Sequence, residues 1–368
     1  MNNPRILFAG GGTGGHIYPA LSIADAIKAI EPGAAIEFAG TQDRMEWKVV
    51  PKNGYAIHPI TVSGFHRGEL KRNLLFPFKL LRGLWQSWNL VKHFDADVVV
   101  GTGGFVAGPV LFAASLRGRP IVLQEQNAHA GVTNKLLAKR ASEIHIAFEG
   151  AKNAFPEEKC VLNGNPTRPE LQKVDEKRAE ARAHWGIPEG VTVVLMFGGS
   201  LGSLALNNAM EAHHAALLAD ERIFLIWQTG ARYYERLTQR IQEHPRLRLL
   251  QYIDRMDLAY AAADIALCRS GAITCSELMV TGTPSILVPS PNVAEDHQTK
   301  NAESMAEAKA ASLLPEARLD AALVNEVRTL VQDPTRRTQM RTAARSIARP
   351  DAAHDIATSV LQLAQRRR

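Results

Sequence analysis

The fold of this chain is decided by the stretch RILFAGGGTGGHIYPA, from Arg5 to Ala20. Its apolar residues Ile6–Ala9 predict a buried strand, and the run Gly10–Gly15 predicts a sharp turn with exposed backbone amides. We expect Pro19 in the first turn of the helix that follows, a position that proline favours. A strand, a glycine loop and a helix N-terminus together form a favourable site for phosphate or another anion. The alternative is a tight turn that binds nothing.

Two common nucleotide-binding patterns do not fit this stretch. The glycine run matches GxGxxG, but the predicted second strand, Ile36–Ala39, does not end in an acidic residue that would bind a ribose hydroxyl. No Gly-Lys-Ser/Thr follows the glycines, so a P-loop is excluded. A nicotinamide-dependent oxidoreductase is therefore the least favoured function.

Length and composition indicate a globular protein of two domains. The chain has 368 residues, of which 46% are hydrophobic and 22% charged. Its three cysteines are widely spaced, which argues against a disulfide framework or zinc site and fits a reducing compartment. Met1 leads directly into the first strand, so we expect no signal peptide, and no apolar run is long enough to span a membrane. The net charge of +6 favours an anionic partner.

Short apolar strands alternate with helices along the chain, which predicts parallel sheets covered on both faces. In the first half, strands are also expected at Val98–Val100 and Ile121–Leu123, and a short helix at Met45–Pro51. The turn-rich stretch Asn163–Pro169 is the predicted linker. Beyond it, the predicted strand Val191–Phe197, the loop Gly198–Ser203 and the helix Ala205–Leu218 repeat the first strand–glycine–helix unit. The remaining predicted elements are strands at Ile223–Gln228, Leu247–Leu250, Ile265–Cys268 and Ser285–Val288, and a terminal helix at 351–368.

In the second half, the sequence block that most indicates chemistry is CRSGAITCSE, Cys268–Glu277. A strand is expected to end at Cys268 and a helix to begin near Thr274. In one interpretation Thr274 and Glu277 form a capping box. In the other, Glu277 binds two ribose hydroxyls while the loop amides face a phosphate. Both interpretations remain open on spacing alone.

Seven blocks of sequence resemble the MurG family, bacterial glycosyltransferases that add N-acetylglucosamine to lipid I. They are GGGTGGHIYPALSIA (10–24), GTGGFVAGP (101–109), EQNAHAGVTNK (125–135), GNPTR (164–168), GGSLG (198–202), CRSGAITCSE (268–277) and DHQTKNA (296–302). The resemblance implies an α/β GT-B fold, in which two doubly wound Rossmann-like domains face each other across a cleft. The expected domains are residues 1–164, with a helix at about 350–368 packing back on them, and residues 165–349.

The resemblance also implies an activity and its partners. The donor would be UDP-N-acetylglucosamine and the acceptor lipid I, undecaprenyl-pyrophosphoryl-muramyl-pentapeptide, giving lipid II for peptidoglycan synthesis. No cofactor and no nucleic acid is implied, and the protein would be peripheral at the cytoplasmic face of the plasma (inner) membrane. Open alternatives are a GT-B transferase using another lipid acceptor such as diacylglycerol, a UDP-N-acetylglucosamine epimerase, and a non-catalytic nucleotide-sugar-binding protein.

Family roles carry over to matching positions. The donor would be bound by Glu277 at the ribose, the Ile253 backbone at the uracil, Ser200 and the amides of Ala272, Ile273 and Thr274 at the diphosphate, and Gln298 and Asn301 at the sugar. The reacting centre would be lined by Thr13, Gly14, Gly15, His16, Asn127 and Arg168. Two positions depart from the family pattern: Leu201 replaces the glutamine of GGSQG, and His297 replaces the first of two adjacent glutamines.

The implied reaction requires a base, because a sugar hydroxyl must lose its proton as it attacks the anomeric carbon. His16 is our candidate, since imidazole titrates near neutral pH, and Glu125 is the second. Alternatively, His16 only hydrogen-bonds a phosphate or the neighbouring loop, and Glu125 is a structural partner of nearby amides. A single displacement would invert the anomeric centre. Arg269 would stabilise charge on the phosphates or pair with a carboxylate.

Asp95-Ala96-Asp97 matches the metal-binding Asp-x-Asp motif of many glycosyltransferases by letter. It lies before the predicted strand Val98–Val100, at the amino end, whereas ligands collect at carboxyl ends. We therefore interpret it as a surface turn and predict no protein-bound metal.

Phe65–Trp88 is rich in aromatic residues and in Lys and Arg, with Glu69 as its sole acid. Apolar residues at helical spacing usually face a core. This composition is also typical of segments that lie on anionic lipid. We predict that part of this segment binds the membrane surface.

Overall fold

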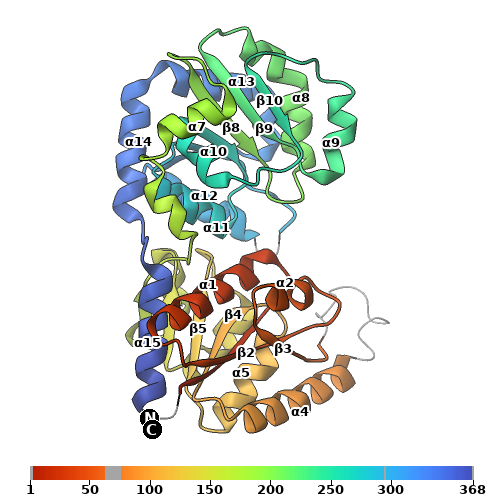
Figure 1. The fold of residues 1–368 in the computed structure, drawn as a ribbon, viewed down its shortest axis with the longest axis vertical. Helices are drawn as coiled ribbons and strands as arrows, with labels where there is room; N and C mark the ends of the chain where they lie inside the picture. The colour runs from red at the N-terminus through yellow and green to blue at the C-terminus, as the bar shows by residue number, and fades with distance from the viewer. Residues whose placement is uncertain (1–2, 63–75, 294–295, 367–368) are drawn as a thin grey trace. The chain divides into compact units, whose positions relative to one another are not determined.

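The chain forms two compact α/β units. In the computed structural model, which describes residues 3–62, 76–293 and 296–366, the first unit ends at Thr167 and is completed by the segment from Asp351 onward. The second unit is Arg168–Pro350. Each unit contains one parallel sheet with helices packed on it (Figure 1).

The first unit has a seven-stranded parallel sheet in the order β3-β2-β1-β4-β5-β6-β7. Its strands are β1 (Arg5–Gly10), β2 (Ala35–Gly40), β3 (Ala56–Pro59), β4 (Val98–Gly103), β5 (Ile121–Glu125), β6 (Glu143–Ile146) and β7 (Cys160–Leu162). The strand order reverses between β1 and β4. Ligands bind beyond the carboxyl ends of strands at such a switch point, and the first glycine loop follows β1 there.

The helices of the first unit are α1 (Gly14–Ile30), α2 (Glu46–Lys52), α4 (Phe76–Phe94), α5 (Ala107–Leu116), α6 (Val132–Leu137) and α15 (Ala352–Arg366). The terminal helix α15 returns to this unit and packs on α1. Ile356 and Val360 of α15 are fully buried in one apolar cluster with Ile17 and Ile27 of α1. The i, i+4 spacing of the apolar residues of α15 produces this one-sided contact.

The second unit repeats this plan with a six-stranded parallel sheet in the order β10-β9-β8-β11-β12-β13. Its strands are β8 (Thr192–Phe197), β9 (Ile223–Gln228), β10 (Leu247–Leu250), β11 (Ile265–Cys268), β12 (Ser285–Leu287) and β13 (Ala311–Leu313). Its helices are α7 (Arg178–Trp185), α8 (Leu204–Leu218), α9 (Ala231–Thr238), α10 (Met256–Ala262), α11 (Ala272–Thr281), α12 (His297–Glu307), α13 (Leu319–Gln332) and α14 (Pro334–Ile347).

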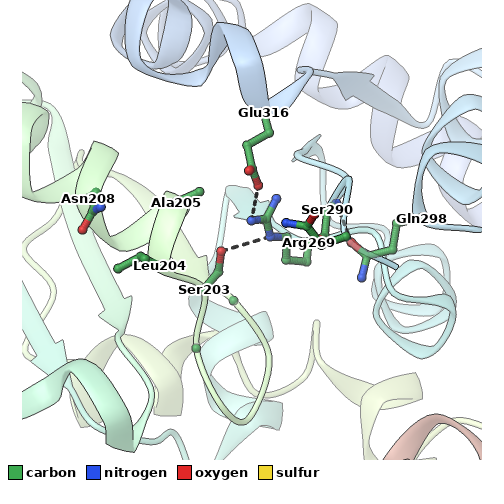
Figure 2. Close-up of a pocket in the computed structure, with 11 residues that line it drawn as sticks. Ser203, Leu204, Ala205, Asn208, Arg269, Ser290, Gln298 and Glu316 are labelled. Carbon is green, nitrogen blue, oxygen red and sulfur yellow. Dashed lines mark hydrogen bonds and ion pairs between the residues drawn. The ribbon is translucent and has the colours of Figure 1, made fainter. Parts of the chain in front are cut away.

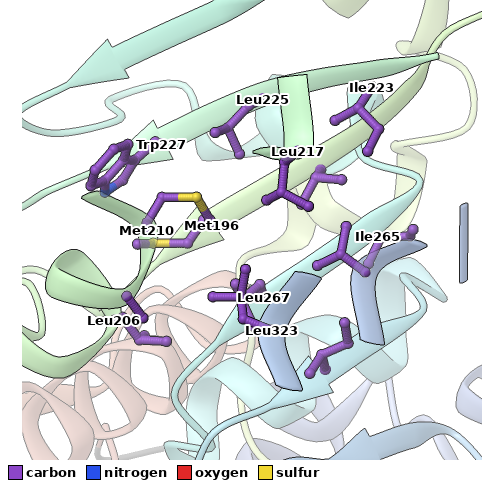
Figure 3. Close-up of a cluster of buried hydrophobic side chains, with 14 of the residues drawn as sticks. Met196, Leu206, Met210, Leu217, Ile223, Leu225, Trp227, Ile265, Leu267 and Leu323 are labelled. Carbon is purple, nitrogen blue, oxygen red and sulfur yellow. The ribbon is translucent and has the colours of Figure 1, made fainter. Parts of the chain in front are cut away.

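A buried cluster fixes α8 on this sheet and thereby places the second glycine loop. Met196, Leu206 and Trp227 belong to this cluster (Figure 3). The indole Nε1 of Trp227 donates to Asn207 Oδ1 at 2.9 Å, and Asn207 Nδ2 donates to the Thr229 carbonyl at 2.8 Å. Buried polar groups that are paired in this way stabilise one arrangement of the elements.

Several predicted boundaries differ from the structure. Pro19 does not begin a helix, because α1 already starts at Gly14 and Pro19 lies inside it. The predicted strand Val98–Val100 is longer in the structure, because β4 continues through Gly103. The short strands β3, β6, β7 and β13 were not predicted, since each has four residues or fewer and little apolar pattern.

The predicted linker Asn163–Pro169 spans the division between the two units, and most of it belongs to the first unit. Asn165 is buried there, where its side chain accepts from Gln124 Nε2 at 2.8 Å and donates to the Gln126 carbonyl at 2.9 Å. These two hydrogen bonds tie residues 165–167 to β5 and its following loop, so the division falls at Thr167 rather than at residue 164.

Candidate functional site

The first glycine loop is already occupied by a side chain of the protein. The carboxylate of Glu46, at the start of α2, accepts from the Gly12 amide at 2.9 Å, the Thr41 amide at 3.2 Å and the Thr41 hydroxyl at 2.7 Å. Glu46 is 1% exposed. Glu46 was not among the predicted site residues, although a glutamate in the first turn of a short helix after β2 was the available signal.

The amides at the start of α1 lie next to this carboxylate. Thr13 is the N-cap residue and its side chain makes no capping hydrogen bond, while Thr13 and Gly15 are exposed. The first amides of a helix have no acceptor within the helix, so Gly14 and Gly15 present unsatisfied N–H groups. An anion is therefore favoured at these amides rather than at Gly12.

His16 is held by the ends of two neighbouring strands. Its Nδ1 lies 2.9 Å from the Thr102 carbonyl and 3.1 Å from Gln126 Oε1. Both neighbours are acceptors, so the neutral ring carries its proton on Nδ1 and leaves Nε2 as an acceptor. A Cβ on Gly103 would lie 2.8 Å from His16 Nδ1, so only glycine lets the ring approach this closely.

Glu125, the other candidate base, is enclosed by hydrogen-bond donors. Its carboxylate accepts from the Asn127 amide at 3.1 Å, the Gly131 amide at 2.9 Å and Asn134 Nδ2 at 2.8 Å. Asn127 also contacts it through its side chain at 3.4 Å. This geometry matches the structural interpretation of Glu125, because a buried carboxylate with these partners holds the loop after β5 in place.

The Asp-x-Asp sequence lies at the amino end of β4. Asp95 Oδ1 pairs with Arg119 Nη2 at 2.5 Å, and Asp97 Oδ2 accepts from the Arg5 amide at 2.9 Å. Each carboxylate is therefore paired with a neighbouring segment, Asp95 with the Arg119 side chain and Asp97 with the backbone of Arg5. Within residues 3–62, 76–293 and 296–366, no group of three His, Cys, Asp or Glu side chains has the arrangement needed to hold a metal ion.

In the second unit, a cavity of about 520 Å³ opens at the second glycine loop and the start of α8 (Figure 2). Its lining residues come from the ends of β8, β11 and β12 and from α8 and α12, and include Gly198, Gly202, Ser203, Arg269, Ser290, Gln298 and Glu316. Figure 2 shows the Arg269 side chain at the centre of this group.

All three nitrogens of the Arg269 guanidinium donate hydrogen bonds to neighbouring groups. Nε donates to Ser203 Oγ at 3.0 Å, Nη1 to the carbonyls of Val288 and Pro289 at 3.1 Å each, and Nη2 to the Glu316 carboxylate. Of the two interpretations from the sequence, the structure supports pairing with a carboxylate. The hydrogen bond from Arg269 Nε to Ser203 joins the end of β11 to α8, because Ser203 is the N-cap of α8.

The capping-box interpretation of Thr274 and Glu277, one of the two left open by the sequence, is wrong. Helix α11 begins at Ala272 with Gly271 as its N-cap, and Thr274 lies inside the first turn. Glu277 instead points to other elements: its Oε1 accepts from Arg168 Nε at 3.1 Å and Nη2 at 2.8 Å, and its Oε2 accepts from the Tyr260 hydroxyl at 3.0 Å. Burial raises the pKa of Glu277, and the Arg168 charge acts against that rise.

The other predicted donor-binding residues differ in exposure. Ser200 is exposed in the glycine loop, and the adjacent Leu201 is 80% exposed. Gln298 lines the cavity, where its Oε1 accepts from the Ser290 amide at 2.9 Å. Asn301 is fully buried and donates to the Ser270 carbonyl at 3.1 Å. The Ile253 amide already donates to Gln228 Oε1 at 2.9 Å, so this part of its backbone is engaged.

Helix α4 exposes an apolar face to solvent. Phe78, Leu81 and Trp85 are 71%, 65% and 68% exposed, while Gly83 and Ser87 face inward. Lys79 and Arg82 are exposed on the same helix. Of the predicted membrane-binding segment Phe65–Trp88, residues 65–75 lie outside the described residues. Across the described parts of the chain, no helix combines the length and apolar character needed to cross a bilayer.

Two doubly wound parallel units, each with a glycine loop after its first strand, correspond to the two domains of the GT-B fold, and the family models below assign them to glycosyltransferases. The crystal structure of MurG from Acinetobacter baumannii matches with a TM-score of 0.79 at 28% identity, over 98% of this chain and 99% of that one. The family models for the glycosyltransferase family 28 N-terminal and C-terminal domains match residues 6–146 and 193–356. The chain belongs to glycosyltransferase family 28.

Two relatives carry the name UDP-N-acetylglucosamine--N-acetylmuramyl-(pentapeptide) pyrophosphoryl-undecaprenol N-acetylglucosamine transferase. The protein from Salinibacter ruber is 56% identical over 99% of this chain and 98% of its own length. The protein from Flavobacterium psychrophilum is 41% identical over 99% of both chains. The resemblance to the MurG family, predicted from seven short blocks, is confirmed over the full length of the sequence.

Proposed function

We propose that this protein is an inverting glycosyltransferase that moves N-acetylglucosamine from UDP-N-acetylglucosamine to the muramyl sugar of lipid I, giving lipid II. The observation that carries this proposal is the 56% identity, over 99% of the chain, to a relative named for that reaction. Identity at this level spans both glycine loops and both units, so it applies to the donor and the acceptor alike.

The proposal divides the substrates between the two units. Residues 1–164, with the helix at about 350–368, would bind the acceptor, and residues 165–349 would bind the nucleotide sugar. The acceptor and the reacting centre would meet Thr13, Gly14, Gly15, His16, Asn127 and Arg168. The donor would meet Ser200, Ile253, Arg269, Ala272, Ile273, Thr274, Glu277 and Gln298, while the buried Asn301 would act through the Ser270 carbonyl that it binds.

His16 would act as the general base through Nε2. The Thr102 carbonyl, 2.9 Å from Nδ1, fixes the tautomer in which Nε2 has a free lone pair. As the muramyl hydroxyl attacks the anomeric carbon, Nε2 takes its proton, the bond from that carbon to the UDP oxygen breaks, and UDP leaves with the electron pair. Attack opposite the leaving group inverts the anomeric centre and gives a β-linked product.

Charge on the departing UDP would be stabilised by backbone dipoles. The amides of Ala272, Ile273 and Thr274 form the first turn of α11, where N–H groups lack helical acceptors and favour an anion. Arg269 would act mainly by fixing Ser203 and the second glycine loop, because Glu316 neutralises its charge. Preorganised donors of this kind need little rearrangement as charge develops.

The exposed face of α4 would place the enzyme on the cytoplasmic leaflet of the inner membrane, where lipid I is anchored. Phe78, Leu81 and Trp85 would enter the interface, and Lys79 and Arg82 would meet anionic headgroups. A peripheral attachment of this kind suits an enzyme with one membrane-bound and one water-soluble substrate.

The test is transfer of labelled sugar from UDP-N-acetylglucosamine to a short-chain lipid I analogue, by the wild type and by His16→Ala. We expect disaccharide-lipid from the wild type, a loss of about 10²–10⁴-fold in the variant, and unchanged donor affinity. His354→Ala, which alters an exposed histidine on α15, is the matched control. Sugar transfer to diacylglycerol, or turnover of the nucleotide sugar without any acceptor, would refute the assignment of lipid I.

A further inference from the structure

Tyr260 is a buried phenol that contacts the carboxylate of Glu277. It lies on α10, is 2% exposed, and packs edge-on against Phe197 with ring centroids 6.1 Å apart. Its hydroxyl donates to Glu277 Oε2 at 3.0 Å. No substrate group can reach a ring buried this deeply, so Tyr260 can act on a ligand only through Glu277.

The hydrogen bonds of Glu277 leave little capacity for a ligand. A carboxylate offers about four lone-pair positions, two on each oxygen. Arg168 takes two of these at Oε1, with Nε at 3.1 Å and Nη2 at 2.8 Å, and Tyr260 takes one at Oε2. One lone-pair position on Oε2 therefore remains for a ligand while Arg168 keeps its two hydrogen bonds. The hydrogen bond from the Tyr260 hydroxyl determines the direction of that lone pair.

We propose that Tyr260 is a positioning residue for the ribose of the nucleoside diphosphate, acting by holding Oε2 of Glu277 toward a ribose hydroxyl. The inference deepens the proposed function and rests on its assignment of Glu277 to the ribose. Without the phenol, this carboxylate would be anchored by Arg168 alone and would rotate about its terminal torsion, which is broad in glutamate.

The phenol is suited to this role because it remains a donor. Burial, together with the nearby Glu277 carboxylate, raises the pKa of Tyr260 well above 10.0, so the hydroxyl keeps its proton at all working pH values. A neutral donor of fixed direction aligns a carboxylate without adding a second positive charge, which would compete with the ligand. The guanidinium of Arg168 supplies the one charge that this buried carboxylate needs.

The same contacts set the protonation of Glu277. Burial and the Glu170 carboxylate raise its pKa, while Arg168 and the Tyr260 hydroxyl lower it. Loss of the hydroxyl therefore raises the pKa of Glu277 further. A protonated Glu277 accepts fewer ribose hydrogen bonds, so the effect of losing Tyr260 should increase as the pH falls.

The experiment compares UDP with 2′,3′-dideoxy-UDP in calorimetric binding to the full-length wild type and to Tyr260→Phe. We expect Tyr260→Phe to weaken UDP binding about tenfold at pH 7.5 and more at pH 5.5, the size expected for one hydrogen bond to a charged group. Binding of dideoxy-UDP should be unchanged, as should kcat at saturating donor. Tyr55→Phe, which removes a tyrosine–carboxylate hydrogen bond to Asp25 in the first unit, is the matched control.

Two further variants separate positioning from a packing defect. 4-Aminophenylalanine at position 260 keeps a donor at the same place and should restore UDP affinity. It also serves as the test if Tyr260→Phe does not fold. In a Glu277→Gln background, Tyr260→Phe should add little to the loss, because the two residues act on one interaction.

Equal weakening of UDP and dideoxy-UDP by Tyr260→Phe, no weakening of either, or failure of 4-aminophenylalanine to restore affinity would overturn the proposal. A wild type that does not bind UDP would overturn both this proposal and the proposed function. If the expected binding pattern is found but no sugar reaches the lipid I analogue, the proposed function fails and the role of Tyr260 stands.

Discussion

The two glycine loops follow the same sequence plan but carry opposite charges beside them. In the first unit, the Glu46 carboxylate accepts from the Gly12 amide. In the second unit, the Arg269 guanidinium donates to Ser203, the N-cap of α8. A glutamate carboxylate therefore binds the first loop and an arginine guanidinium binds the second, although both loops follow the first strand of a doubly wound sheet.

This difference shows that a glycine loop alone does not define a phosphate site. Elements distant in sequence supply the charge: Glu46 comes from α2, beyond β2, and Arg269 from the end of β11. The Glu46 carboxylate binds the Gly12 amide of the first loop. We propose that the second loop, held by Arg269, binds the nucleoside diphosphate.

The largest loss of donor affinity should come from Gly202→Ala, which adds one methyl group to the second glycine loop. Gly202 has φ +78°, and a Cβ there would lie 2.0 Å from the Thr229 carbonyl oxygen, so Gly202→Ala must displace the loop. We expect donor affinity to fall 100-fold or more, since a shift of about 1 Å in a site has effects of that size. Titration of the variant with UDP measures it.

Gly12→Ala in the first loop is the comparison. Gly12 has φ +87°, but a Cβ there meets nothing within 4 Å, so only backbone strain of about 1–2 kcal/mol is added. Donor affinity should be unchanged and acceptor kinetics only mildly affected. Equal loss of donor binding in both variants would contradict the division of roles between the loops.

Arg269→Lys should have the next largest effect. Lysine cannot reproduce a planar fork that reaches Ser203, two carbonyls and Glu316 together. We expect donor affinity to fall about tenfold, which corresponds to one charged hydrogen bond, with acceptor KM unchanged. Arg222→Lys, at an exposed pair with Asp220, is the control that should bind donor normally. Normal binding by Arg269→Lys would mean that Arg269 does not brace the loop.

Glu46→Gln should have a smaller effect, confined to the first unit. The amide keeps the shape of the side chain but loses one acceptor oxygen facing the Gly12 and Thr41 donors, at a cost of about 1–3 kcal/mol in stability. Acceptor KM should change several-fold while donor KM does not. Denaturant unfolding and steady-state kinetics measure these two effects, with Glu37→Gln as the matched control. A change in donor KM alone would contradict our interpretation of the first loop.

The smallest effect is a difference in acid sensitivity between the units. Burial lowers the pKa of His145 on β6, so between that value and 6.5 the unfolded chain binds more protons and the first unit loses stability as the pH falls. In the second unit, hydrogen bonds from Arg255 hold the pKa of Asp257 well below 3.8, so its contribution is lost only as the pH falls below about 4.

Hydrogen exchange at pH 7.5 and 5.5 tests this difference. After correction for the intrinsic rate, protection of β6 should fall a few-fold at pH 5.5 while protection of α10 holds. His145→Gln should remove the pH dependence in β6. Greater loss of protection in α10 than in β6 at pH 5.5 would show that the sign is wrong.

Central strands such as β9 and β11 could be predicted because they are fully buried and therefore largely apolar, and the edge strand β10 because three of its four residues are leucine. Predictions at Ile223–Gln228, Leu247–Leu250 and Ile265–Cys268 match β9, β10 and β11 residue for residue. The short strands β3, β6, β7 and β13 lacked that signal. Proline favours the first turn of a helix, so Pro19 suggested a helix start, but α1 already starts at Gly14 and contains Pro19.

Site residues that directly follow a predicted strand or glycine loop could be predicted from the sequence. Residues that reach the site only as hydrogen-bond partners from distant segments could not. His16, Arg269 and Glu277 were all singled out from their local sequence. Their partners Gln126, Glu316 and Tyr260 were not, since each lies 17 or more residues away in the sequence.

The sequence by itself determined the family, the two doubly wound units and the positions of both glycine loops. These follow from local properties: apolar runs that must be buried, and glycines that permit a close turn. Only the tertiary structure decided which loop is closed by a carboxylate, that His16 presents Nε2, and that Arg168 and Tyr260 share Glu277. Those outcomes depend on hydrogen bonds between elements that meet only after folding, and strand pairing rather than sequence distance brings them together.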